Sequence, residues 1–384
     1  MARKDSHAHP DFQSRLFIFK VSSRCNLNCS YCYMYNMGDN TYKRRPPTMS
    51  LRTASDALTR ITKYCSEQKI TEILLTLHGG EPLLVKRKWY SAFFSLIEKH
   101  RTDNLKIELA LQTNATLLSD AWIDFLIENN VGFGISVDGP KEVNDEFRVD
   151  HRGRGSYVAV ERAIRRLVAR QEIEGKWGVL IVANPRHSPI SILEHFVDLG
   201  VRKFDFLFPD FNHDVRPPWP EGLLTNYYLD LFDHWYSLKG ASIRVRLFES
   251  IIQGLLGRPT GVDAIGLHPI SEVVIETDGG LEPLDVLRTC GDGFTALNLN
   301  VARNDIDELR ATNLFKLGLE NHQRLCEKCL QCPALDTCGG GYLPHRFARE
   351  NGFSNPSIHC ETLYALTSHI FDRIQKDLDA ATSG

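Results

Sequence analysis

The sequence lacks the segments that carry a chain into or across a membrane. Residues 1–15 are polar and contain no apolar run of the signal-peptide kind, and no other stretch approaches the roughly 20 apolar residues that span a bilayer. A strong charge of either sign is also missing, because 45 lysines and arginines face 48 aspartates and glutamates. With no long basic run interleaved with aromatics, the composition argues against nucleic-acid and membrane partners. We therefore expect a cytoplasmic protein.

Ten cysteines are present in a chain of 384 residues whose hydrophobic content, 42%, is ordinary for a globular protein of about two or three domains. In a small secreted protein they would suggest a disulfide framework. In a long chain without a signal peptide, they indicate reduced thiols that bind metal. Cys65 is an exception, because it lies on the apolar face of an expected helix that Ser50 can cap. We predict that its thiol is buried in the core.

Strand-like and helix-like segments alternate through the first two thirds of the chain. The expected strands cover residues 16–21, 73–78, 106–112, 132–137, 177–183 and 203–208. The helices that follow the first one are expected at 89–99, 119–129 (capped by Ser119), 155–170, 189–199 and 222–238. This alternation is typical of a parallel sheet with right-handed crossovers. Because no dinucleotide-binding glycine pattern follows the first strand, we predict an α/β fold with a partial (β/α)6 TIM-type barrel.

The periodicity changes towards the end of the chain, where cysteines become frequent. We therefore divide the chain into a polar tail (residues 1–15), a barrel core (16–240), a bridging segment (241–270) and a cysteine-rich C-terminal domain (271–384).

Three cysteines cluster in the loop after the first expected strand, in the stretch Cys25-Asn-Leu-Asn-Cys29-Ser-Tyr-Cys32. Three thiolates can hold three irons of a cubane iron-sulfur cluster, which normally takes four cysteines. One iron would then be open to another ligand. A zinc site is a weaker interpretation, because structural zinc usually takes four ligands arranged as two pairs.

Polar residues follow the other strands in the same way. Gly79-Gly80-Glu81-Pro82 follows the second strand, and Gln112, Asn114, Ser136 and Asp138 follow the third and fourth. Because the carboxyl ends of barrel strands meet at one mouth, we expect these residues to lie close to the three cysteines.

The spacing C-x3-C-x2-C, with the aromatic Tyr31 before the last cysteine, resembles the radical SAM superfamily. That resemblance implies S-adenosylmethionine bound to the open iron of a 4Fe-4S cluster and split by one electron into a 5'-deoxyadenosyl radical. It further implies cofactor contacts by Tyr31, Gly79, Gly80 and Glu81 (methionine end), Ser136 and Asp138 (ribose), Arg148 (carboxylate), Gln112 and Asn114. Arginine suits a carboxylate because its planar fork pairs with both oxygens. From the sequence alone, Arg148 could instead form a surface ion pair with Asp145 or Glu146.

The last third of the chain resembles the SPASM extension of peptide-modifying radical SAM enzymes, which carries auxiliary 4Fe-4S clusters. The matching residues are Cys329, Cys332, Cys338 and Cys360. Leu284 and Tyr342 stand where the pattern expects cysteines for a second auxiliary cluster. That site is either lost or rebuilt from Cys290 and Cys326, and zinc is an alternative for the group around Cys329.

Asp285 follows Leu284 where sulfatase-maturing relatives carry a proton-accepting aspartate. A carboxylate in a dry cavity could act as such a base, although a turn residue is the alternative.

The block from Cys338-Gly-Gly-Gly-Tyr to Ser357-Ile-His-Cys360 resembles the FxsB-type radical SAM/SPASM maturases of ribosomal peptides. This resemblance implies a carbon-carbon crosslink, a cyclophane, between an aromatic ring and a nearby β-carbon of a precursor peptide. It also implies an external electron donor such as flavodoxin or ferredoxin. Formylglycine formation in a sulfatase and peptide epimerisation are alternative activities, and a non-catalytic iron-sulfur electron carrier is an alternative of another class.

Overall fold

The computed structural model describes residues 12–101, 104–238 and 242–382. Its centre is a curved parallel sheet in which six consecutive strands lie in chain order. These strands are β1 Leu16–Ser22, β2 Glu72–Gly79, β3 Lys106–Thr113, β4 Val131–Ser136, β5 Trp177–Val182 and β6 Lys203–Leu207. Each overlaps a strand expected from the sequence, so the partial barrel is confirmed. Most of the predicted polar tail, residues 1–11, lies outside the described residues.

Three further strands extend the sheet on both sides and were not expected. They are β7 Arg244–Val245, β8 Val273–Ile275 and β9 Leu281–Glu282, and the complete order is β7-β6-β5-β4-β3-β2-β1-β8-β9. β8 pairs in parallel with β1, with Phe17 opposite Val273, and β9 is antiparallel to β8. The bridging segment and the C-terminal segment therefore both contribute strands to the barrel sheet.

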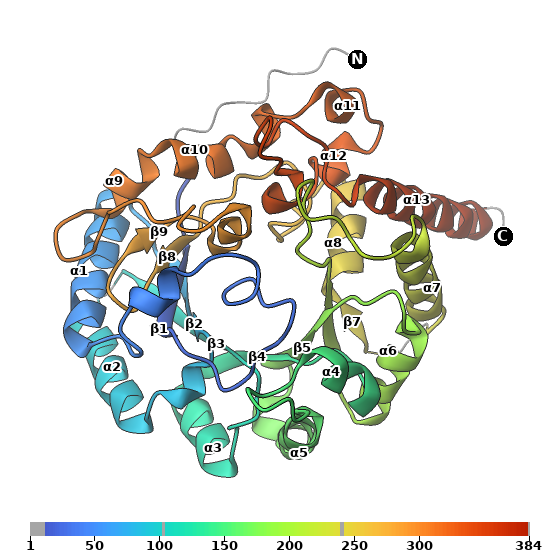
Figure 1. The fold of residues 1–384 in the computed structure, drawn as a ribbon. Helices are drawn as coiled ribbons and strands as arrows, with labels where there is room; N and C mark the ends of the chain where they lie inside the picture. Colours follow the sequence, from blue (N-terminus) through green and yellow to red (C-terminus); the bar gives the residue numbers. More distant parts are fainter. Residues whose placement is uncertain (1–11, 102–103, 239–241, 383–384) are drawn as a thin grey trace.

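Helices surround this sheet (Figure 1). They are α1 Leu51–Glu67, α2 Arg87–His100, α3 Asp120–Glu128, α4 Lys141–Phe147, α5 Tyr157–Val168, α6 Pro189–Asp198, α7 Leu223–Ser237 and α8 Arg246–Leu255. Ser50 and Ser119 cap α1 and α3 as expected, since each side chain accepts a hydrogen bond from the backbone N–H three residues later. α4 was not predicted, because its seven residues are mostly polar and show no apolar stripe.

The C-terminal region consists of short elements followed by one long helix. Its helices are α9 Ile306–Arg310, α10 Asn313–Leu319, α11 Glu327–Leu330, α12 Leu335–Cys338 and α13 Cys360–Thr382, and α13 packs beside α7 (Figure 1). Short 3-10 helices occur along the chain at η1 Thr41–Arg44, η2 Pro82–Leu84, η3 Gln171–Ile173, η4 Asp285–Cys290, η5 Asn321–Gln323 and η6 Leu343–Arg346. In the described ranges, none of the helices has the length and apolar character needed to span a bilayer.

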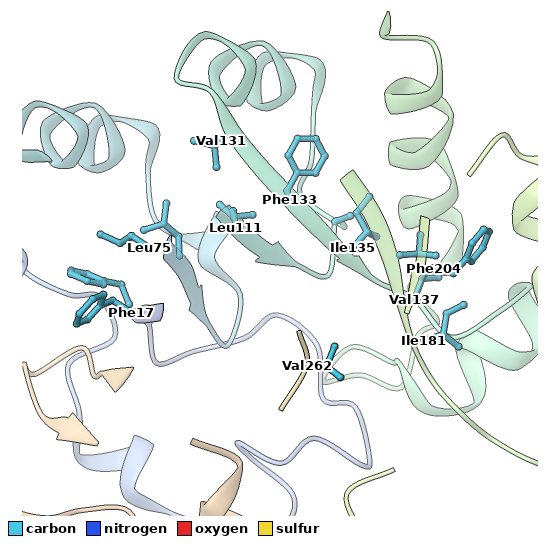
Figure 2. Close-up of a cluster of buried hydrophobic side chains, with 14 of the residues drawn as sticks. Phe17, Leu75, Leu111, Val131, Phe133, Ile135, Val137, Ile181, Phe204 and Val262 are labelled. Carbon is cyan, nitrogen blue, oxygen red and sulfur yellow. The ribbon is translucent and has the colours of Figure 1, made fainter. Parts of the chain in front are cut away.

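The main hydrophobic core lies between the strands and the surrounding helices. Alternate residues of β1, such as Phe17 and Phe19, point into it and are fully buried. Figure 2 shows the same arrangement at Leu75, Leu111 and Ile135, which come from successive strands. Cys65 belongs to this core, which confirms the prediction of a buried thiol. The other face of the strands points to the inside of the barrel.

Candidate active site

A cavity of about 1250 Å³ occupies the inside of the barrel. Its wall includes residues from β1 to β6, residues 261–264 and 268–272, and the side chains of Tyr342 and His345. The loop after β1, dark blue in Figure 1, crosses the mouth of the barrel. It brings Cys25, Cys29 and Cys32 into the cavity wall, as the sequence predicted.

Backbone hydrogen bonds hold the three-cysteine loop in place. The N–H of Asn28 donates to the carbonyl of Val149 at 2.7 Å, and the N–H of Cys32 donates to the carbonyl of Cys29 at 3.0 Å. The first bond ties the loop to the segment after α4. The second closes a turn within the loop, between the second and third cysteines.

The electrostatics of the three thiols fit a bound metal cluster. Burial, followed by the charge of Glu81, raises the pKa of Cys25 to about 12, and burial with the charge of Cys29 raises the pKa of Cys32 to about 11. Three neighbouring thiolates would repel one another in this setting unless a cation held them. Sulfur ligands of this kind suit iron, so the residues present fit an iron-sulfur cluster.

Gly79 and Gly80 line the cavity, and both positions exclude a side chain. A Cβ at Gly79, where φ is +134°, would lie 2.2 Å from the carbonyl oxygen of Ser22. A Cβ at Gly80 would lie 2.0 Å from the hydroxyl of Tyr35. Close contact with the end of β1 at Gly79, and with Tyr35 at Gly80, therefore requires glycine at both positions, in addition to any approach of a cofactor.

Glu81 and Asp138 lie close to the three cysteines, as expected, because their charges act on Cys25 and Cys29, but both lie behind the cavity wall. Both are buried and neither lines the cavity, so direct contact with a cofactor does not follow from their geometry. The Glu81 carboxylate accepts hydrogen bonds of 2.8 Å from the N–H groups of Leu83 and Asn114 and from the Thr113 hydroxyl. Burial nevertheless raises its pKa to about 7. Glu81 thus links the end of β2 to the end of β3 through hydrogen bonds, and it lies behind the cavity wall.

Gln112, Asn114 and Ser136 do line the cavity, as predicted. The Gln112 amide donates to the Ser136 hydroxyl at 2.7 Å, and the Asn114 amide donates to the side-chain oxygen of Asn26 at 3.0 Å. Gly134 leaves room for this arrangement, because a Cβ there would lie 2.1 Å from the Gln112 side chain. These residues form a polar wall beside the three cysteines.

Arg148 lies in the same wall and is buried. Its Nη1 donates to the Tyr31 hydroxyl at 2.6 Å, and Tyr31, which also lines the cavity, donates in turn to Asp138. The ion pair with Asp145 or Glu146 considered from the sequence is not formed. The Nε of Arg148 is buried without a hydrogen-bond partner. A buried guanidinium with an unused donor fits an incoming carboxylate.

Asp285, the predicted base, lines the cavity close to the cysteine loop. Its carboxylate forms a buried ion pair with Lys20 and accepts a hydrogen bond of 2.7 Å from the Tyr33 hydroxyl. Lys20 also lies 3.0 Å from Nδ1 of His78. Burial opposes ionisation, but the positive charges of Lys20 and Arg288 outweigh it and hold the pKa of Asp285 well below its usual range.

Sequence reasoning missed Lys20, Tyr33 and His78. Lys20 carried a detectable signal, since it is a charged residue inside an otherwise apolar strand segment. A lysine there must face a partner or a cavity, because an unpaired buried charge is costly. Its partner is too distant in the sequence for the pattern to identify.

The comparison with protein families assigns the chain to a known superfamily. A family model described as the radical SAM superfamily matches residues 19–216, just over half of the chain. The chain belongs to the radical SAM superfamily. It is therefore a radical SAM enzyme whose cofactors are S-adenosylmethionine and a 4Fe-4S cluster.

Several curated relatives match this radical SAM enzyme along nearly its whole length. A cysteine-type anaerobic sulfatase-maturating enzyme of Clostridium perfringens (strain 13) is 28% identical over 94% of this chain and 96% of its own length. A serine-type anaerobic sulfatase-maturating enzyme of Bacteroides thetaiotaomicron is 27% identical over 93% and 90%. The solved structure of native anSMEcpe with bound AdoMet has a TM-score of 0.81 and 25% identity, covering 95% of this chain and 99% of that one. These comparisons do not confirm the expected FxsB-type membership.

The cysteine-rich region of this radical SAM enzyme forms a second cavity of about 310 Å³. Its wall contains Cys329, Cys332, Cys338 and Cys360, so the predicted four-cysteine group is brought together. Cys326 lies beside the group, with its sulfur 3.6 Å from that of Cys329. The group is consistent with an auxiliary 4Fe-4S cluster, since four thiolates can saturate one.

Cys290 does not join this group. It packs in a separate apolar cluster that includes Leu284 and Leu343, with Tyr342 against it. Burial raises the pKa of the Cys290 thiol. The neighbouring groups that also affect this pKa are Thr289 and Asp214, and neither is a cysteine. The alternative in which Cys290 and Cys326 rebuild a second auxiliary site is therefore not supported, because Cys326 lies with the Cys329 group. Apolar packing fills the surroundings of Leu284.

Proposed function

We propose that this radical SAM enzyme oxidises a side chain of a polypeptide substrate. The observation that carries the proposal is the shared cavity, whose wall contains both the three-cysteine loop and the Lys20–Asp285 pair. The bound cofactors would supply a carbon radical able to remove a hydrogen atom from an unactivated carbon. Cys25, Cys29 and Cys32 would hold the cluster, and Arg148 and Ser136 would orient S-adenosylmethionine.

Asp285 is the carboxylate in the cavity wall that we propose takes the proton that such an oxidation releases. It is ionised before a substrate arrives, because Lys20 stabilises its charge. The Tyr33 hydroxyl orients the carboxylate, and His78 fixes Lys20 from the other side. The low pKa limits the strength of this base, so the proton is held only weakly and can be passed on to solvent.

Formylglycine formation from cysteine or serine is the reaction best supported by the comparisons. Relatives of both the cysteine and the serine type align over more than nine tenths of this chain. The structure of anSMEcpe with AdoMet and the Cp18Cys peptide has the same fold as this chain. An auxiliary cluster held by Cys329, Cys332, Cys338 and Cys360 would accept or relay electrons.

Aromatic crosslinking is a second candidate, and the environment of Leu284 favours it. The SPASM pattern places cysteines of a second auxiliary cluster at positions 284 and 342, whereas Leu284, Cys290 and Tyr342 of this chain lie in or against an apolar cluster. The resemblance of the Cys338–Cys360 block to FxsB-type maturases supports the same reaction. Its substrate would be a ribosomally made precursor peptide containing an aromatic residue.

One experiment distinguishes these reactions. The anaerobically reconstituted enzyme is incubated with S-adenosylmethionine, a reductant, and either a cysteine- or serine-containing peptide or an aromatic precursor peptide, and the products are analysed by mass spectrometry. Formylglycine reacts with a hydrazide reagent, whereas a crosslinked peptide has lost two hydrogens and does not react. Unchanged mass with altered stereochemistry would indicate epimerisation. An enzyme that releases no 5'-deoxyadenosine would instead be an electron carrier, and the proposal would fail.

The identity of the electron donor is a separate proposal. We expect a small flavodoxin or ferredoxin to deliver the electron that the cluster needs. Replacing dithionite by either protein with its reductase should support 5'-deoxyadenosine formation, and failure of both would exclude this class of donor.

A further inference from the structure

The cysteine-rich region buries an arginine that has no role in the sites described above. Arg346 is the last residue of η6, and its side chain is fully buried. Its Nη2 donates to the carbonyl of Arg324 at 2.6 Å, and Nε and Nη2 donate to the carbonyl of Phe353 at 3.2 and 3.1 Å. Its Nη1 donates to the side-chain oxygen of Asn321 at 2.5 Å and to the carbonyl of the same residue at 3.4 Å. All of these acceptors are neutral, so they satisfy the donors without balancing the charge.

Arg346 has no carboxylate beside it. Within the described ranges 12–101, 104–238 and 242–382, it forms no ion pair with an aspartate or a glutamate. Arg288 is buried to the same extent, but it pairs with Glu276, Glu282 and Asp39. A charge that lies in a protein interior without a counter-charge is costly. Arg346 therefore needs an anion other than a carboxylate of this chain.

The cysteines of the second cavity are the nearest source of such an anion. Burial lowers the pKa of Arg346, and the charges that oppose this shift are those of Cys329, Cys326 and Cys338. A Cβ on Gly340 would lie 3.8 Å from Nη1 of Arg346, and Gly340 lines the cavity that contains the four-cysteine group. Arg346 itself does not line that cavity. The guanidinium therefore lies directly behind the wall that faces the thiols.

The thiols of this cavity have the opposite charge problem. Burial, with the charges of Cys360 and Cys332, raises the pKa of Cys338 to about 12. Burial raises the pKa of Cys329 to about 12 as well, and neighbouring cysteines add to the shift. A 4Fe-4S cluster held by four thiolates has a net negative charge, which increases when the cluster is reduced. A buried cation behind the wall stabilises that charge, and stabilises the reduced form more than the oxidised form.

We infer that Arg346 is the buried counter-charge of the auxiliary cluster and raises its reduction potential. The inference rests on the proposed function, because that proposal assigns a cluster to the four-cysteine group. In the proposed oxidation, the substrate radical loses one electron and one proton, and Asp285 takes the proton. The cluster gains the electron, and a higher potential makes it a better acceptor. Arg346 touches neither substrate nor S-adenosylmethionine, so it acts as a positioning residue through the cluster.

The test measures a reduction potential and requires no turnover. The starting protein is the full-length chain with Cys25, Cys29 and Cys32 replaced by alanine, so that only the auxiliary cluster gives an EPR signal in a redox titration. Arg346→Met should lower the equilibrium constant for reduction at least tenfold, which is about 59 mV for a one-electron couple. Arg346→Lys keeps the positive charge and should retain most of the original potential.

Asn321→Asp is the diagnostic variant, because it balances the charge of Arg346 without removing the side chain. The side-chain oxygen of Asn321 already accepts a hydrogen bond from Arg346, so an aspartate of the same shape would form an ion pair there. The potential should fall as in Arg346→Met, while iron content and thermal unfolding stay near those of the starting protein. The control is Arg324→Met, because Arg324 is exposed and pairs with Glu320, and its potential should not change.

Three results would overturn the inference. These are an unchanged potential in Asn321→Asp, an equal fall in the Arg324→Met control, and a four-cysteine group that binds zinc and gives no EPR signal. The first would mean that Arg346 only joins neighbouring carbonyls, because its hydrogen bonds persist in that variant. Asn321→Asp decides the question even if Arg346→Met does not fold. A shifted potential in an enzyme that oxidises no peptide would disprove the proposed function and leave the role of Arg346 standing.

Discussion

At the scale of single residues, the site depends on buried charges whose partners decide their chemistry. Asp285 and Glu272 line one cavity, but Asp285 is held ionised by Lys20 whereas Glu272 forms no ion pair within the part of the chain that the structure describes. Burial alone would raise the pKa of either carboxyl group. The ion pair reverses that effect at Asp285, so the pKa of Asp285 is lowered whereas the pKa of Glu272 is raised.

Replacing Lys20 by methionine should destabilise the protein by about 3–5 kcal/mol at neutral pH, because Asp285 would stay buried without its partner. The folded-state pKa of Asp285 is depressed, so its stabilising contribution is present above the unfolded pKa and is lost as the pH falls through the folded value. The difference between wild type and Lys20→Met should therefore shrink below about pH 4. Urea unfolding at several pH values measures this difference in the free energy of unfolding. The double variant with Asp285→Asn should recover most of the stability, and no recovery would contradict the pairing.

Replacing Arg148 by glutamine should weaken the binding of S-adenosylmethionine by roughly ten- to a hundredfold, the effect of losing a charge-assisted hydrogen bond. Equilibrium dialysis against the reconstituted enzyme measures it. Iron content should not change, because Arg148 supplies no ligand to the cluster. The exposed Arg152→Gln variant is the control, and equal affinities of the two variants would refute the assigned role.

At the scale of elements, a buried ionic network joins the added hairpin β8–β9 to the segment after the cysteine loop. Arg288 in η4 is fully buried and pairs with Glu276, Glu282 and Asp39. Arg45 pairs with the same two glutamates. This network fixes η4, and with it Asp285, relative to the mouth of the barrel.

Arg288→Met should therefore lower the free energy of unfolding by about 3–5 kcal/mol, since it leaves buried carboxylates uncompensated. Arg165→Met removes an exposed pair with Glu161 and should cost at most about 0.5 kcal/mol. Urea unfolding compares the two variants. Similar losses would show that the network contributes no more than a surface pair.

At the scale of the whole molecule, the two cysteine groups should bind iron independently. The enzyme should contain about eight irons, and removal of either group by alanine substitution should leave about four. The two variants are Cys25, Cys29 and Cys32 to alanine, and Cys329, Cys332, Cys338 and Cys360 to alanine. Iron and sulfide analysis measures the content. Zinc in place of iron in the first variant would show that the C-terminal group is a zinc site.

A chain that ends at residue 265 should fold poorly even though it retains the three-cysteine loop. It lacks β8, so the edge of β1 would lose its partner and expose unpaired backbone groups. Limited proteolysis and soluble yield test this expectation. A stable, soluble fragment would show that the barrel does not need the strand supplied by the C-terminal region.

Local sequence patterns were sufficient to predict the barrel strands, the helix caps at Ser50 and Ser119, and the loop that carries Cys25, Cys29 and Cys32. Each depends on neighbours a few residues apart, through side-chain periodicity or a capping hydrogen bond. Short β8 and β9 gave no such pattern, because they are too brief for alternation to be recognised.

The sequence by itself determined the order of the elements and the presence of two cysteine groups, because both are encoded in residue spacing. Only the tertiary structure decided that Asp285 contacts Tyr33, 252 positions away, that Glu81 lies behind the wall, and that Cys290 packs with leucines. These outcomes depend on which distant surfaces pack together. Packing is a property of the assembled core, where one buried contact excludes another, and no local spacing records it.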